Sequence, residues 1–255
     1  MKKNPLFLSL SVLVFLGCFG VEKPEKPGWE LTFHDEFDQI RLDKQAWVPM
    51  DPWQKERNNE LQAYVRDAFE LEDGILKIVA SERQAGYDGK VREYASGMMT
   101  TCENFSQKYG WFEVRCKVPK GKGLWPAFWL LPEPLGWPPE IDVLEVLGHE
   151  PTTIYFNNHW FDDEGKHLSS LQEWHGTDLS ADYHVIALEW NPDVLIWYVD
   201  GQERARTTDA IPQQPMFLLL NLAVGGAWPG APDSTTVFPS SFDVDYVRVY
   251  ERKSS

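Results

Sequence analysis

The sequence predicts an all-β protein, a β-jelly-roll sandwich of two antiparallel sheets, and three observations carry this prediction. From Trp29 to Tyr250 the apolar residues alternate with a period of two far more often than with the 3.6-residue period of a helix. The 18 Gly and 18 Pro indicate short strands joined by many turns. Capped segments of helical length are nearly absent, and only residues 43–48 (DKQAWV) could hold a helical turn.

The composition narrows the class of protein. The 255 residues are 43% hydrophobic and 25% charged, which is typical of a globular chain and sufficient for one large all-β domain. The formal charge of −15 excludes a nucleic-acid binder that relies on a basic surface to displace counterions from phosphates. Twelve Trp are many for this length, and in an acidic β-rich domain they suggest stacking surfaces for carbohydrate.

The N-terminus has the pattern of an export signal. A basic start (MKK) precedes an apolar run that is too short to span a bilayer as a stable anchor, and the run ends F-L-G-C at Cys18. We expect residues 1–17 to be a lipoprotein-type signal peptide, with Cys18 carrying lipid and tethering the exported protein to the cell envelope. The alternative is an ordinary secretory peptide that is cut nearby. Residues 18–28 form a polar, Pro-bearing spacer.

Strand patterns recur from residue 29 to residue 251, which we expect to form one domain followed by a tail at 252–255. The clearest are 73–81 (DGILKIVAS), 111–118 (WFEVRCKV), 183–190 (YHVIALEW), 195–203 (LIWYVDGQE) and 242–251 (FDVDYVRVYE). The Asp200-Gly201 pair within 195–203 is a hairpin-turn signal.

Buried side chains are expected at several of these positions. Trp111, Trp190 and Trp197 stand inside regular alternation, which favours core packing. Cys102 and Cys116 both lie in strand-like segments of an exported chain. They form either a cross-strand disulfide or two reduced, buried thiols.

The most informative segment is 136–148 (GWPPEIDVLEVLG), where three carboxylates stand in an apolar strand. Glu140 and Asp142 share a face because they are two residues apart, whereas strict alternation sends Glu145 to the other face. A β-bulge near Val143-Leu144 returns Glu145 to the face of the other two acids. Crowding then raises at least one pKa, which suits an ionised nucleophile beside a protonated acid. The alternative is an edge strand whose carboxylates face solvent.

EIDVLE (140–145) resembles the E-x-D-x-x-E signature of glycoside hydrolase family 16, the laminarinase-like endo-β-glucanases with a β-jelly-roll fold. Further segments that resemble family blocks, in the family's order, are 58–65 (NNELQAYV), 96–132, 183–201, 218–230 (LLLNLAVGGAWPG) and 242–250. The chain departs from the pattern at Pro138-Pro139, where family laminarinases usually have Gly before the first acid, and at 149–160. These differences leave the exact glycan open.

The resemblance implies an endo-acting, retaining hydrolase of β-1,3- or mixed β-1,3/1,4-glucan. Glu140 would be the nucleophile and Glu145 the general acid/base, with Asp142 between them, tuning Glu140. A retaining mechanism needs two carboxyls about 5–5.5 Å apart, one to attack the anomeric carbon and one to protonate the leaving oxygen. No cofactor is expected for catalysis, and the six His show no metal-ligand spacing that would indicate a catalytic zinc. A Ser-His-Asp hydrolase has no support, because no G-x-S-x-G motif is present.

The resemblance also implies a substrate cleft on a concave sheet. Sugar C–H faces stack on indole rings while the hydroxyls reach polar neighbours. The substrate-binding residues so implied are Asn58, Trp125, Trp129, Trp137, His159 and Trp228, with His159 on the aglycone side. Core packing is the alternative for Trp125 and Trp129, and an ordinary hydrogen-bonding role is the alternative for His159.

Family members often hold one structural Ca²⁺ on the convex side, and the matching positions here are Glu36, Gly74 and Asp245. The expected partner is a polysaccharide bound by a monomer, with no nucleic acid and with membrane contact only through Cys18. Two other interpretations stay open. One is the same mechanism on a red-algal galactan such as agarose or carrageenan, and the other is a non-catalytic glycan-binding protein. The three carboxylates at the right spacing favour an enzyme.

Overall fold

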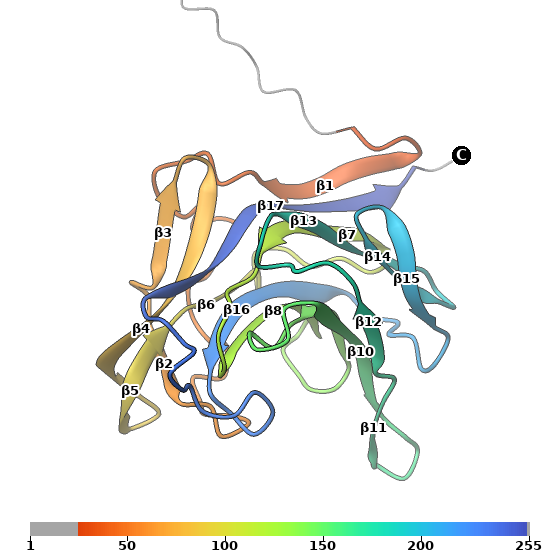
Figure 1. The fold of residues 1–255 in the computed structure, drawn as a ribbon. Helices are drawn as coiled ribbons and strands as arrows, with labels where there is room; N and C mark the ends of the chain where they lie inside the picture. The colour runs from red at the N-terminus through yellow and green to blue at the C-terminus, as the bar shows by residue number, and fades with distance from the viewer. Residues whose placement is uncertain (1–24, 254–255) are drawn as a thin grey trace, which may run out of the picture.

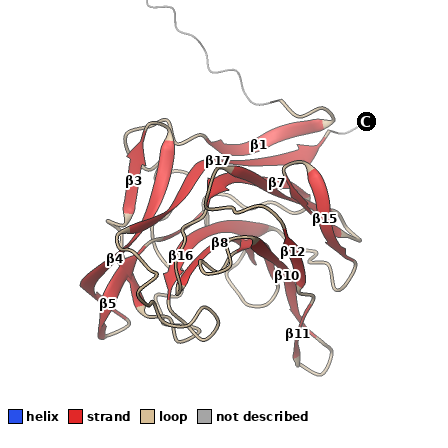
Figure 2. Ribbon diagram, in the orientation of Figure 1, coloured by secondary structure: helices blue, strands red, loops and turns tan. Residues whose placement is uncertain are grey.

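The computed structural model describes residues 25–253, in which every regular element is a β-strand (Figure 2). The strands are β1 (Trp29–Asp35), β2 (Gln62–Tyr64), β3 (Phe69–Glu72), β4 (Ile75–Tyr87), β5 (Lys90–Ser96), β6 (Met98–Thr100), β7 (Gly110–Lys117), β8 (Leu124–Pro132), β9 (Glu140–Glu145), β10 (Thr153–Phe161), β11 (His167–Ser169), β12 (Gln172–His175), β13 (His184–Trp190), β14 (Leu195–Val199), β15 (Gln202–Thr207), β16 (Met216–Val224) and β17 (Ser240–Arg252). The turn expected at 43–48 is present but does not extend into a helix, since the amides of Ala46 and Trp47 donate to the Asp43 carbonyl at 3.2 and 2.8 Å.

The strands form two sheets that stack face to face (Figure 1). The ten-stranded sheet has the order β15-β14-β13-β7-β17-β4-β5-β2, with β1 paired to β17 and β3 paired to β4. The seven-stranded sheet has the order β11-β10-β9-β8-β16-β6, with β12 paired to β10. Neighbouring strands run antiparallel except β2 and β5, which are parallel. The predicted sandwich of two sheets is confirmed.

The main core lies between the sheets and follows the period-two pattern. In β7, Phe112, Val114 and Cys116 enter this core and are at most 1% exposed. Arg115 and Lys117 alternate with them on the other face of the sheet and are only partly buried. Removing such large apolar side chains from water is the main favourable term for a fold without helices.

The three tryptophans expected in the core are all buried, but on two sides of the ten-stranded sheet. Trp190 and Trp197 lie between the sheets and are at most 1% exposed. Trp111 is 8% exposed and belongs to a separate cluster on the opposite face of β7, where its Nε1 donates to Glu113 Oε2 at 2.6 Å. Alternation determines which residues share a face, but not which face the second sheet covers.

The two cysteines are free thiols in separate clusters. Cys116 lies in the main core, whereas Cys102 follows β6 and packs near Met98 and Trp129 on the seven-stranded sheet. Burial raises the pKa of both thiols, that of Cys102 to about 11. Of the two arrangements that the sequence left open, the structure has the reduced one.

The two ends of the described chain lie side by side, because β1 pairs with β17 and places Trp29 opposite Arg252. The signal peptide expected at 1–17, Cys18 and most of the 18–28 spacer lie outside the described residues. Between residues 25 and 253, no helix has the length and hydropathy needed to span a membrane.

Candidate active site

Strand β9 carries the three carboxylates, and a β-bulge turns them all to one face. In the register with β8, Asp142 and Leu144 pair with consecutive residues, which leaves Val143 without a partner. The extra residue shifts the alternation by one, so that Glu145 returns to the face of Glu140 and Asp142. Val143 and Leu144 are fully buried in the core behind the acids. The predicted bulge is confirmed.

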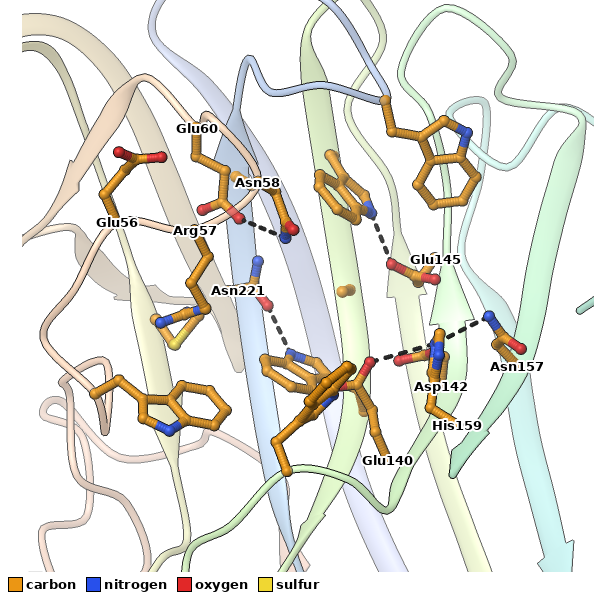
Figure 3. Close-up of a pocket in the computed structure, with 18 of the residues that line it drawn as sticks. Glu56, Arg57, Asn58, Glu60, Glu140, Asp142, Glu145, Asn157, His159 and Asn221 are labelled. Atoms are coloured by element: carbon orange, nitrogen blue, oxygen red, sulfur yellow. Dashed lines mark hydrogen bonds and ion pairs between the residues drawn. The ribbon is translucent and has the colours of Figure 1, made fainter. Parts of the chain in front are cut away.

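Indole N–H groups point at the two outer carboxylates (Figure 3). Trp125, on the neighbouring strand β8, donates from Nε1 to Glu145 Oε1 at 3.0 Å. Trp137, in the loop before β9, donates from Nε1 to Glu140 Oε2 at 3.0 Å. Each bond fixes one carboxylate oxygen and favours the ionised form of the acid.

His159 faces the other side of the acidic group. Its Nε2 is 3.2 Å from Asp142 Oδ2 and 3.5 Å from Glu140 Oε1. The side chains meet because the register of β10 with β9 places His159 directly opposite Glu140. The three residues present potential metal-ligand atoms within 4.8 Å of one another, but such proximity follows from this hydrogen-bonded arrangement and does not by itself assign a metal.

The backbone under the bulge is held from the opposite sheet. Trp197, on β14, reaches across the core and donates from Nε1 to the Asp142 carbonyl at 3.0 Å. A bulge disrupts the ladder locally, and a buried carbonyl without a partner is costly. The Trp197 indole therefore satisfies the backbone at the point where the strand changes its alternation.

The electrostatics of the site distinguish Glu140 from Glu145. Burial and the nearby Asp142 raise the pKa of Glu140 to about 8, whereas His159, the Trp137 N–H and Arg57 lower it. Burial, Asp142 and Glu140 raise the pKa of Glu145 well above its ordinary value, and only the Trp125 N–H opposes them. Glu145 is therefore the acid that retains a proton most strongly, because no cation faces it.

The carboxylates lie in a cleft of about 790 Å³ over the face of the seven-stranded sheet that points away from the ten-stranded one. Alternation along β8 separates the two sides of this sheet. Trp125, Ala127 and Trp129 line the cleft, whereas Leu124 and Phe128 are fully buried in the core. The cleft crosses the strands from β10 and β11 at one end to the loop before β2 at the other.

All six residues predicted to contact substrate line this cleft: Asn58, Trp125, Trp129, Trp137, His159 and Trp228. Trp137 and Trp228 are 44% and 40% exposed, so both offer ring surface to a ligand. Trp129 is only 9% exposed because Trp53 stacks on it, with ring centroids 6.2 Å apart. For Trp129 the sequence left core packing and sugar stacking open. In the structure its ring lines the cleft but is largely covered by Trp53.

The loop at 49–58 contributes residues that the sequence analysis did not identify. The Arg57 guanidinium lies 4.5 Å over the Trp53 ring and pairs with the buried carboxylate of Asp51 at 3.0 Å. Asn58 donates to Glu60 Oε1 at 3.2 Å, and burial raises the pKa of Glu60. Glu60 could have been identified from its place in the segment NNEL (58–61), next to Asn58. No sequence pattern indicated that Trp53 stacks on Trp129.

Three further polar residues of the cleft were also missed: Asn157, His167 and Asn221. Asn157 and His159 are two residues apart on β10 and share its cleft face. Asn221 accepts a hydrogen bond from Trp129 Nε1 at 2.8 Å. The period-two rule applied to NNHW and LLLNLAV could have identified both asparagines. His167 depends on the closure of the β10–β11 hairpin, which has no comparable local signal.

The positions predicted for calcium lie away from the cleft. The pairings of β1 and β4 with β17 bring the backbones at Glu36, Gly74 and Asp245 toward the junction between β1 and β4 along β17. The Glu36 carboxylate pairs with Arg248 at 2.6 Å, and Asp245 pairs with Arg115. Both carboxylates at the predicted positions therefore already have arginine partners.

The sequence and the fold were compared with those of known proteins. A model of the family described as glycosyl hydrolases family 16 matches residues 65–248. A β-glucanase of Rhodothermus marinus is 36% identical over 281 residues, which cover 98% of this chain and 95% of that protein. The endo-1,3-1,4-β-glycanase EglC of Rhizobium meliloti is 35% identical over 240 residues. That match covers 86% of this chain but 51% of EglC, so the chain spans about half the length of that relative.

A solved structure has the same fold. The catalytic domain of an endo-1,3-β-glucanase (laminarinase) from Thermotoga petrophila superposes with a TM-score of 0.80. Its sequence is 36% identical, and the match covers 89% of this chain and 99% of that domain. The likeness therefore covers most of this chain and nearly all of that domain.

Proposed function

The chain belongs to glycosyl hydrolase family 16, and from this premise we propose that it is a retaining endo-β-glucanase that cleaves β-1,3- or mixed β-1,3/1,4-glucans. One observation carries the proposal: because of the bulge at Val143, the side chains of Glu140, Asp142 and Glu145 all point into the same cleft, which is bordered by indole rings. Buried acids of this kind are costly for stability, and a catalytic site is where such a cost is retained.

In the first step Glu140 is the nucleophile and Glu145 the acid. A Glu140 oxygen forms a bond to the anomeric carbon while the bond from that carbon to the glycosidic oxygen breaks. Glu145 gives its proton to the departing oxygen. Glu140 is assigned as the nucleophile because the groups around it favour its ionised form: His159, the Trp137 N–H and Arg57 all lower its pKa.

In the second step a water molecule attacks the same carbon and gives a proton to Glu145, and the ester bond to Glu140 breaks. The ester removes the negative charge of Glu140, which is one of the groups that raise the pKa of Glu145. The pKa of Glu145 therefore falls after the first step, and the same residue serves as a base. Two inversions at the carbon retain its configuration.

Sugar binding is assigned to the exposed rings and the polar groups beside them. Trp228 and Trp137 offer faces on which sugar C–H groups stack, and Asn58 and Asn157 offer amides for hydroxyls. Trp129 with Trp53 bounds the glycone side of the cleft. His159 lies on the aglycone side, toward the β10–β11 hairpin.

The proposal extends to properties that rest on the sequence alone. We place the mature enzyme outside the cytoplasm, as a monomer tethered through lipid on Cys18 after cleavage of residues 1–17. We also place a structural Ca²⁺ at Glu36, Gly74 and Asp245, with catalysis independent of it. Mass spectrometry of the membrane fraction and melting curves with and without a chelator test these two points.

The direct test is the release of reducing sugar from laminarin, barley mixed-linkage glucan, lichenan and agarose, with product sizes read by chromatography. Oligosaccharides from laminarin or the mixed-linkage glucans are expected, and their linkages identify the preferred bond. Cleavage of agarose alone would move the chain to the galactan-degrading branch. Binding to a glycan without cleavage of any substrate would make it a glycan-binding protein.

A further inference from the structure

His167 is a polar residue of the cleft that the proposed mechanism does not use. It is the first residue of β11, on the hairpin that extends the seven-stranded sheet beyond β10 (Figure 1). Its Nε2 lies 2.9 Å from His159 Nδ1, and the two rings lie edge to edge and nearly coplanar, with centroids 5.1 Å apart and planes 16° apart. The ring of Trp137 covers His167, at 4.9 Å between centroids.

The two nitrogens of His159 thus face different groups. Nδ1 faces His167, while Nε2 faces Asp142, Glu140 and the Asn157 amide, whose Nδ2 is 2.9 Å away. The orientation of that amide is fixed, because Asn157 Oδ1 accepts the backbone N–H of Asn158 at 3.0 Å.

Both protonation states of His159 use the same contact with His167. When His159 is neutral with its proton on Nδ1, Nε2 accepts from Asn157 and Nδ1 donates to His167. When His159 is charged, Nε2 carries a second proton toward Asp142 and Glu140, and Nδ1 still donates to His167. His167 is the constant acceptor, and it serves only while its own Nε2 is unprotonated.

We propose that His167 is a positioning residue that accepts the Nδ1 proton of His159 and so holds the imidazole with Nε2 toward Glu140 and Asp142. The proposal deepens the proposed function and rests on it, because the acids that His159 faces are those assigned to catalysis. His167 touches none of the reacting atoms. It acts by orienting the imidazole whose charge lowers the pKa of Glu140 against the effects of burial and Asp142.

The charged groups around the pair agree with this role. His159 faces Glu140 and Asp142 on β9, and their negative charges together with the Asp142 hydrogen bond raise its pKa against the opposing effect of burial. His167 faces Trp137, Phe161 and His159, and burial and His159 lower its pKa. One ring is therefore held as the donor and the other as the neutral acceptor.

The test uses the full chain with His167→Ala and His167→Gln, since glutamine places an oxygen acceptor near the position of Nε2. The matched control is His175→Gln on β12, a 69%-exposed histidine side chain that also lies on a strand paired with β10. Two properties are measured: the pKa and tautomer of His159 by ¹⁵N NMR of the imidazoles, without substrate, and the pH dependence of kcat/KM on barley glucan.

With His167→Ala we expect the pKa of His159 to fall by about one pH unit. Both forms lose the acceptor, but the charged imidazolium makes the stronger hydrogen bond and therefore loses more. The acidic limb of kcat/KM, which follows ionisation of the nucleophile Glu140, should move to higher pH, because the imidazole charge that lowers the pKa of Glu140 is held less well. His167→Gln should restore both values, and His175→Gln should change neither.

An unchanged His159 tautomer and pKa in folded His167→Ala would overturn the proposal, as would an altered pKa with an unmoved acidic limb or a failure of glutamine to rescue. If the wild type cleaves no glycan, the proposed function fails, whereas the NMR titration still decides whether His167 controls His159.

Discussion

The indole N–H of Trp125 donates to Oε1 of Glu145 across 3.0 Å, from one strand of the sheet to the next. The register places Ala127 directly opposite Glu145, so this bond runs diagonally between neighbouring residues on the cleft face. One side chain thus has two effects. Its ring borders the cleft, and its N–H lowers the pKa of Glu145 against burial and the two acidic neighbours.

Trp125→Phe should move the alkaline limb of the pH dependence of kcat/KM to higher pH by about one unit. The phenyl ring keeps a stacking surface, but loss of the N–H donor raises the pKa of Glu145, which must be protonated to act as an acid. Trp228→Phe is the matched control, because Trp228 contacts Trp125 edge to face and should affect KM without moving this limb. A limb that stays in place or moves to lower pH in Trp125→Phe would contradict the assignment.

Glu145→Gln should stabilise the protein at neutral pH while it abolishes hydrolysis. A carboxyl whose pKa is higher in the folded than in the unfolded chain binds more protons when folded. The free energy of unfolding therefore falls as pH rises above the unfolded pKa. We expect Tm at pH 7 to rise by about 3 °C or more in Glu145→Gln, with the difference shrinking near pH 4.

The control for that melting experiment is Glu173→Gln, on the exposed strand β12. It should leave Tm unchanged at both pH values. A Glu145→Gln variant that melts below the wild type at pH 7 would show that the ionised carboxylate is compensated by its surroundings, and the acid assignment would lose its electrostatic basis.

Trp197→Phe should lower both stability and activity. It leaves the buried carbonyl of Asp142 without its donor, which costs about 1–3 kcal/mol of unfolding free energy and loosens the bulge that positions the acids. Trp190→Phe is matched, since Trp190 is equally buried and its Nε1 donates to the Pro212 carbonyl at 3.2 Å. Chemical denaturation should show similar losses of stability in the two variants. Measurements of kcat should show a reduction in Trp197→Phe alone. Equal kcat in both variants would argue against a role for Trp197 at the bulge.

The two thiols should react independently and without effect on the fold. Cys116 is 1% exposed and Cys102 is partly exposed, and they belong to different clusters. A thiol reagent should modify Cys102 slowly in the native protein and Cys116 only after denaturation, because burial raises both pKa values and thiolate is the reactive form. A reductant that lowers Tm would indicate a disulfide and contradict the structure.

Most of the fold could be predicted from period-two patterns, and the acidic strand β9 is an example. Glu140, Asp142 and Glu145 can share a face only if one residue is added between them, so the bulge near Val143 follows from the sequence. The same rule predicted a buried position for Trp111 but not the side of the sheet on which it packs, because the face opposite Phe112 could be either covered or exposed. Its cluster with Tyr250 depends on contacts between segments far apart in the chain.

The residues of the cleft that escaped the sequence analysis come from loops and hairpins. Trp53 reaches Trp129 because the 49–58 loop is held in place by Asp51, which pairs with Arg57 of the same loop and accepts a hydrogen bond from Tyr87 of β4. His167 reaches His159 through the β10–β11 hairpin. Such placements depend on long-range closure of the chain, for which local propensity and alternation carry no information.

The stereochemistry of hydrolysis tests the central claim most directly. ¹H NMR spectra recorded in the first minutes of barley-glucan digestion by the full chain distinguish the anomer released from the one that accumulates by mutarotation. Retention through Glu140 and Glu145 predicts that the β-anomer of the new reducing end appears first, with no product from Glu140→Gln. Initial release of the α-anomer, or undiminished hydrolysis by Glu140→Gln, would contradict the account.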